Sequence, residues 1–149
     1  MSRKLTLIFL IILLIIFSSR GNDNIAYLEE ETKAIFGAAI NNGPGMIRFS
    51  LSEEGISIHY RLFPEPEIYI NEVIGHELTQ KIRIYYKKIK RADKITFLIL
   101  LPSQDAWGKR RWNPYLYFTT TRKLFDQIDW CNFQDKKLLE IAENIKYIR

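Results

Sequence analysis

The sequence predicts an α+β fold: a four-stranded, mostly antiparallel sheet built from two hairpins, with helices packed on one side. Two patterns carry this prediction. Apolar and polar residues alternate on both sides of a glycine-containing turn, as in a β-hairpin. Further along the chain, apolar residues recur every three or four positions, as in an amphipathic helix. The predicted order of elements is α-β-β-α-β-β-α.

The first predicted helix covers residues 25–40. Its apolar positions recur at helical spacing, and the glutamates at 29–31 occupy its early turns. Negative charge is favoured there because the amino end of a helix carries a partial positive charge. The run Asn-Asn-Gly-Pro-Gly at residues 41–45 is expected to end this helix.

The first predicted hairpin pairs residues 47–52 with residues 56–62. Both segments alternate with period two, and Glu-Glu-Gly at residues 53–55 supplies the turn between them. His59 falls on the polar face of the second strand. The pattern therefore predicts two antiparallel strands with one buried face.

The central helix is predicted over residues 71–90. Asn71 is a candidate N-cap, and basic residues crowd the carboxyl end, where the helix dipole favours them. The apolar stripe that defines its buried face consists of Ile74, Leu78, Ile82, Tyr85 and Ile89.

The second half of the chain predicts another hairpin and a closing helix. Residues 95–101 are almost all apolar, which indicates a central strand covered on both faces. Residues 102–113 are expected to form a connecting loop, and the aromatic and β-branched segment 115–121 a strand. A short helical turn at 122–127 and a helix over 135–147 complete the fold.

Residues 1–21 are predicted to be a signal peptide or an N-terminal membrane anchor. The apolar run from Leu5 to Phe17 follows Arg3 and Lys4 and precedes small residues, as in a secretory signal. As a helix it spans about 20 Å, and it is shorter than the roughly 20 residues that a bilayer core requires. Both alternatives place residues 22–149, a single small α+β domain, outside the cytoplasm.

Charge is distributed unevenly along the chain, which carries a formal net charge of +5. Residues 22–80 hold three basic and ten acidic residues, whereas residues 81–149 hold 16 basic and seven acidic ones. This asymmetry predicts either an oriented binding surface or two halves whose charges neutralise on packing. The single cysteine, Cys131, cannot form a disulfide within the chain and is expected to be a small buried apolar residue.

The segment Gly75 to Gln80, GHELTQ, begins like the zinc-protease signature His-Glu-x-x-His. That signature needs histidines at positions i and i+4, because these face the same way on a helix and share one metal. Here Gln80 stands in the second position, and an amide is a poor zinc ligand. The sequence therefore predicts no catalytic residue, no metal site and no cofactor, with His76 on the polar side of a helix.

The candidate binding segment is WGKRRW. Three cations between two indoles suit an anionic surface, because indoles favour membrane interfaces and stack on planar rings. Basic residues between 81 and 94 are candidates for extending the patch. The alternative is a hairpin connection whose tryptophans fold onto the core while its charges stay in water. The candidate residues are Trp107, Lys109, Arg110, Arg111 and Trp112.

These observations favour an exported or membrane-anchored, non-catalytic binding domain of the cell envelope. Its expected partner is an unidentified protein or an anionic envelope surface, with membrane contact through the segment from Leu5 to Phe17. Nucleic acid is not expected, because the leader exports the domain away from it. A basic-apolar leader before a compact α+β domain resembles many small exported bacterial proteins, in architecture only.

Two alternatives stay open. The first is a small extracytoplasmic hydrolase with an unrecognised site, which a pocket of convergent polar groups would favour. The second is a structural subunit of an envelope complex, which exposed apolar surface at residues 115–118 would favour.

Overall fold

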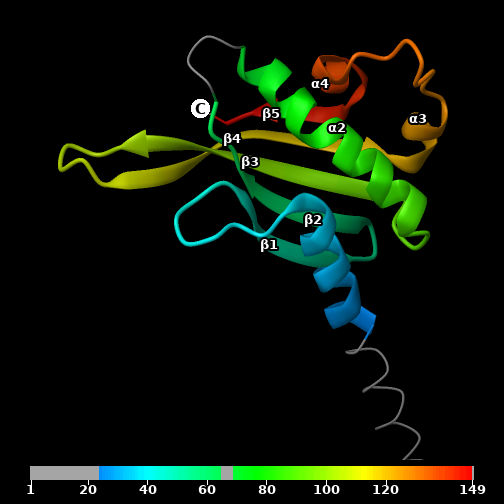
Figure 1. Cartoon of the computed structure of the whole chain (residues 1–149), viewed down its shortest axis with the longest axis horizontal. Coiled ribbons are helices and arrows are strands. Elements are labelled where there is room, and N and C mark those ends of the chain that lie inside the picture. The colour runs from blue at the N-terminus through cyan, green and yellow to red at the C-terminus, as the bar shows by residue number, and fades with distance from the viewer. Residues whose placement is uncertain (1–23, 65–68, 149) are drawn as a thin grey trace, which may run out of the picture. The chain divides into compact units, whose positions relative to one another are not determined.

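The computed structural model describes residues 24–64 and 69–148 (Figure 1). The chain forms two compact units, Met1–Glu31 and Thr32–Arg149. The described residues of the first unit are helical, and the second unit contains the sheet. The predicted leader, residues 1–21, lies outside the described residues. Within the described part, none of the helices combines the length and apolar character that a membrane span requires.

The α+β class is confirmed and both predicted hairpins form, but the sheet is mixed and has five strands rather than four. β1–β2, β3–β4 and β4–β5 are antiparallel pairs, whereas β2 and β3 are parallel. The parallel pair arises because a helix connects these two strands and returns the chain to the same end of the sheet. The strands lie side by side in chain order: β1 (Gly45–Ser52), β2 (Gly55–Arg61), β3 (Lys94–Gln104), β4 (Arg110–Thr121) and β5 (Glu143–Tyr147).

Helix α2 (Ile70–Lys88) is that connection, and it confirms the predicted central helix. Figure 1 shows it lying across one face of the sheet. Phe36 links the two layers, because its ring lies 5.5 Å from that of Tyr85 on α2 and 5.6 Å from that of Phe97 on β3. The predicted stripe is buried at Ile74, Leu78, Ile82, Tyr85 and Ile89.

The amino end of α2 differs from the prediction. Tyr69 occupies the N-cap position without a side-chain hydrogen bond, and Asn71 lies inside the helix. The Asn71 amide instead donates a hydrogen bond to the Tyr147 hydroxyl at 2.8 Å. Asn71 therefore connects the helix to the end of β5, a long-range contact that overrides its local preference for capping.

The first described helix ends at residue 36, earlier than the predicted residue 40. Gly37 adopts a positive φ of 80° there, which glycine accepts without steric cost. Ala38 then pairs with Met46 in an isolated bridge. The chain thus leaves the helix in order to pair with the start of β1.

The segment GHELTQ docks a short helix onto α2. A Cβ atom at Gly75 would lie 2.3 Å from the carbonyl oxygen of Asp135, so only glycine permits this approach. Thr79 donates to the same carbonyl at 2.9 Å, and Gln80 donates to the Asp135 carboxylate at 2.9 Å. The segment therefore holds the 3-10 helix η1 (Asp135–Lys137) against α2.

The closing helix was predicted over residues 135–147, and it is wrong beyond residue 141. η1 and a single turn of α-helix, α4 (Leu138–Ile141), are followed by the strand β5. Asn144 has a positive φ of 53°, which interrupts any helix. β5 pairs with β4, whose edge would otherwise leave backbone groups without partners. Edge pairing, a tertiary effect, decides the structure of this segment.

Strand β3 is central, but only one of its two faces is fully buried. Ile95, Phe97 and Ile99 are fully buried, whereas Leu98 between them is only half-buried. The uninterrupted apolar run led to the expectation of two covered faces, which is wrong at Leu98.

Candidate functional site

The β3–β4 hairpin extends beyond the rest of the sheet. β2 pairs with β3 as far as Leu100, and β5 pairs with β4 as far as Leu116. We call residues 101–113 the hairpin arm, which projects past the other strands in Figure 1. Four pairs join its two strands: Leu101 with Asn113, Pro102 with Trp112, Ser103 with Arg111 and Gln104 with Arg110.

The arm replaces the loop that was predicted over residues 102–113. Its proline and its charged residues are typical of loops, and this led to the wrong assignment. Each strand of the arm has one unpaired side, and proline is tolerated on such edges. A turn reduced to residues 105–109 therefore connects two strands that are longer than predicted.

Asp105 organises the tip of the arm. Its Oδ1 atom accepts hydrogen bonds from the backbone N–H groups of Trp107 at 3.0 Å and Lys109 at 2.9 Å. Its Oδ2 atom accepts from Nε of Arg111 at 3.3 Å. Gly108 supplies the left-handed conformation of the turn, with φ at 74°. One carboxylate thus fixes the backbone on both sides of Trp107.

The two tryptophans of the arm have different environments. Trp107 is 86% exposed at the tip. Trp112 is half-buried, and its indole N–H donates to Oδ1 of Asn42 at 2.7 Å. Trp107 therefore points outward, as expected if the segment binds a partner. Trp112 packs inward, as expected if the tryptophans fold back onto the protein.

A ladder of cations and aromatic rings covers one face of the arm. The Arg61 guanidinium lies 5.1 Å from the Trp112 ring, and Trp112 meets Phe63 edge to face at 4.9 Å. Arg110 lies 4.6 Å above Phe63. Such contacts hold a guanidinium in place while its N–H groups stay free to donate. Arg61 donates to the Asn41 carbonyl at 3.3 Å, so Arg110 is the arginine of the ladder whose N–H groups are available for an anion.

The contacts that support the arm could not be predicted from the sequence. The candidate residues Trp107, Lys109, Arg110, Arg111 and Trp112 remain a prediction, and the structure places all five in the arm. Asn42, Arg61 and Phe63 come from a loop and from the end of β2, far from the arm in sequence. No spacing along the chain indicates these contacts, because they depend on β2 lying beside β3.

A second basic region lies at the opposite end of β3. Since β3 has 11 residues, its ends are about 35 Å apart at roughly 3.3 Å per residue. The basic residues at the carboxyl end of α2 therefore do not extend the arm's surface. Of the basic residues between 81 and 94, Arg83, Lys87 and Lys90 line a surface cavity of about 360 Å³, together with Tyr86, Asp93, Arg122, Phe125, Asp126 and Trp130.

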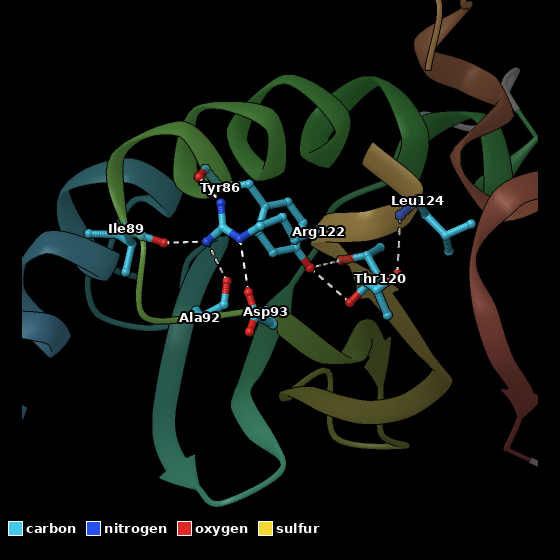
Figure 2. A network of polar contacts seen from close by, with 8 residues as sticks. Tyr86, Ile89, Ala92, Asp93, Thr120, Arg122 and Leu124 are labelled. Atoms are coloured by element: carbon cyan, nitrogen blue, oxygen red, sulfur yellow. Dashed lines mark hydrogen bonds and ion pairs between the residues drawn. The ribbon is translucent and has the colours of Figure 1, made fainter. Parts of the chain in front are cut away.

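Arg122 dominates this second region, and we call its interactions the Arg122 clamp (Figure 2). It is the first residue of helix α3 (Arg122–Asp126). Its guanidinium donates to the carbonyl oxygens of Tyr86, Ile89 and Ala92, the last two at 2.6 Å, and its Nε donates to Asp93 at 3.0 Å. The carboxyl end of a helix exposes unpaired carbonyls, and Arg122 satisfies them.

Tyr86 completes the clamp. Its hydroxyl donates to the Thr120 carbonyl at 2.8 Å, and the Arg122 guanidinium lies 5.2 Å above its ring. Burial raises the pKa of the Tyr86 hydroxyl, and the hydrogen bond with Thr120 partly opposes this rise. The clamp's donors thus point to backbone acceptors within the protein.

Glu77, which would activate water in a zinc protease, has other partners here. Its Oε1 atom accepts from the Tyr60 hydroxyl at 2.5 Å and from Nζ of Lys81. Burial, with this hydrogen bond to Glu77, raises the pKa of Tyr60. His76 is exposed, and the described residues contain no group of metal-ligating side chains.

Two further expectations concern single features of the second half. Cys131 is exposed, so the prediction of a buried cysteine is wrong. In the segment 115–118, Leu116 and Phe118 are buried and Tyr117 is 39% exposed. The apolar surface that would favour a structural subunit is therefore small.

Comparisons with protein-family models, with curated proteins and with solved structures give no match to this chain.

Proposed function

We propose that this chain is an exported or membrane-anchored, non-catalytic binding domain that recognises an anionic surface of the cell envelope through the hairpin arm. The observation that carries the proposal is the composition of the arm's tip. The tip carries an indole that is 86% exposed, and two cations close to it in the chain, Lys109 and Arg110, have no ion pair within the described residues. Exposed cations beside an aromatic ring are the chemistry of anion recognition.

The unpaired charges support binding rather than stability. Arg111 forms the arm's ion pair with Asp105, yet its side chain is 70% exposed, so this pair adds little to folding. Lys109 and Arg110 are exposed and carry formal charge into solvent. An anionic partner would supply the counter-charges that the fold does not.

The test is neutralisation of the arm in the full chain, kept in a neutral detergent. The variant Lys109→Gln/Arg110→Gln/Arg111→Gln is compared with the matched variant Lys87→Gln/Lys90→Gln/Arg91→Gln, which removes the same charge from the α2 end. Retention on immobilised polyglutamate is measured against salt concentration. We expect the arm variant to elute at a lower salt concentration than the matched variant, because exposed cations contribute through screened Coulomb attraction. Equal elution of the two variants would refute the proposal.

A further inference from the structure

We infer that the surface recognised by the hairpin arm is an anionic lipid bilayer, and that Trp107 inserts into its headgroup region. This inference rests on the proposed function and names the partner. It is drawn from the exposure of Trp107, the rigidity of the tip, the placement of the cations and the length of the arm.

Trp107 has the surroundings of an anchor rather than of a packed side chain. Within the described residues, its ring takes part in no aromatic or cation–π contact, and its indole N–H has no hydrogen-bond partner. The other two tryptophans are both half-buried and both contact arginine, with Arg61 over Trp112 and Arg83 over Trp130. An amphipathic ring left in water at a tip suits the interface between headgroups and acyl chains.

Hydrogen bonds to Asp105 brace the tip before any partner binds. The Asp105 carboxylate, whose side chain is 15% exposed, fixes the backbone of Trp107 and Lys109 and pairs with Arg111. Insertion of Trp107 therefore does not require the loop to be ordered, which lowers the entropic cost of binding. The same burial keeps this carboxylate away from lipid phosphates.

The cations lie on both faces of the arm, and this favours a surface over a groove. Arg110 stacks on Phe63 on one face, whereas Arg111 turns to Asp105 on the other. Neighbouring residues of a strand point to opposite faces, so a protein groove along one face would meet only one of the two. A bilayer approached end-on meets both, together with Lys109 at the turn.

The reach of the arm fits the dimensions of a headgroup layer. The four pairs beyond the sheet extend about 13 Å at roughly 3.4 Å per residue. The headgroup layer of one leaflet is about 5–8 Å thick. The indole of Trp107 can therefore reach the acyl boundary while the sheet stays in water.

The test uses tryptophan fluorescence of the full chain with vesicles of phosphatidylcholine, with and without phosphatidylglycerol. The apolar run from Leu5 to Phe17 contains no tryptophan, so it cannot produce the signal itself. We expect phosphatidylglycerol vesicles to shift the emission to the blue and brominated lipids to quench it. Trp107→Phe should abolish both effects, and the matched variant Trp130→Phe should keep them.

The variants separate this inference from the proposed function. Each arm cation replaced by glutamine should weaken binding to phosphatidylglycerol vesicles about fivefold. Quenching that survives in Trp107→Phe would overturn the inference. The inference would also be overturned if the emission of Trp107 did not shift with vesicles while the arm still bound polyglutamate. That outcome would point to an acidic protein partner and would leave the proposed function standing. Loss of all arm-dependent binding would refute both.

Discussion

Arg122 and Arg110 each place a guanidinium over an aromatic ring, 5.2 Å from Tyr86 and 4.6 Å from Phe63 respectively. Arg122 donates hydrogen bonds to three backbone carbonyls and to Asp93, and it is 20% exposed in its side chain. The side chain of Arg110 is exposed and has neither a hydrogen bond nor an ion pair within the described residues.

The difference shows that the ring contact does not decide the role of an arginine. The partners of the N–H groups decide it. An arginine whose N–H groups donate to buried carbonyls stabilises the fold, because its loss leaves those acceptors unpaired. An arginine whose N–H groups have no partner in the protein contributes little to stability and is available for an anion. The two basic regions at the ends of β3 therefore have different expected responses to mutation.

The largest effect is expected at the clamp. Arg122→Ala should lower the free energy of unfolding by about 3 kcal/mol, because it leaves three carbonyls at the carboxyl end of α2 without a donor. Urea unfolding followed by circular dichroism measures this. Arg110→Ala is the matched control and should lose less than about 0.5 kcal/mol. Similar losses in the two variants would remove the contrast between the regions.

Alkaline pH should also act on the clamp. Burial raises the pKa of Tyr86 above its ordinary value of 10.0. The unfolded chain then releases this proton first, so the contribution of Tyr86 to stability is constant below about pH 10 and falls above it, by up to about 1.4 kcal/mol per pH unit. Tyr86→Phe should make the alkaline fall less steep, although Tyr60, whose pKa is also raised, still contributes to it. It should cost about 1 kcal/mol at neutral pH through the lost Thr120 hydrogen bond. An unchanged alkaline slope in the variant would contradict the assignment.

Asp105 combines the two roles, because it stabilises the tip of the arm that is proposed to bind the anionic surface. Asp105→Ala should reduce stability by about 1 kcal/mol, since two backbone N–H groups of the tip lose their acceptor. It should also weaken vesicle binding even though it raises the positive charge of the arm. Stronger binding than in the unmodified chain would show that charge alone, without a fixed tip, determines recognition.

The smallest effect on stability is expected at the tip. Trp107→Ala should change the free energy of unfolding by no more than about 0.5 kcal/mol, because the indole is 86% exposed. Trp112→Ala serves as its counterpart, since that ring lies in the Arg61–Phe63 ladder and bonds to Asn42. A larger loss for Trp107 than for Trp112 would contradict the distinct environments of the two rings.

The candidate site shows where prediction from sequence reached its limit. The sequence alone was enough to single out Trp107 and the cations at 109–111 as candidates, because three cations flanked by two tryptophans are unusual. The extent of the arm was missed, since Pro102 is typical of loops and the strand pairing that tolerates it is not local. The Arg122 clamp was missed for a related reason: Arg122 lies 30 residues or more from the carbonyls of Ala92, Ile89 and Tyr86.

The sequence by itself determined the elements that rest on local periodicity. These are the buried stripe of α2, the alternation of the first hairpin and the α+β class, because side-chain period follows directly from backbone geometry. Tertiary structure alone decided the fate of residues whose local preferences were weak or contrary. Residues 143–147 became a strand because the edge of β4 required backbone partners, and Gly75 proved necessary because η1 approaches α2 too closely for a Cβ atom. Such contacts join segments far apart in the chain, so their energy enters only when the whole domain packs.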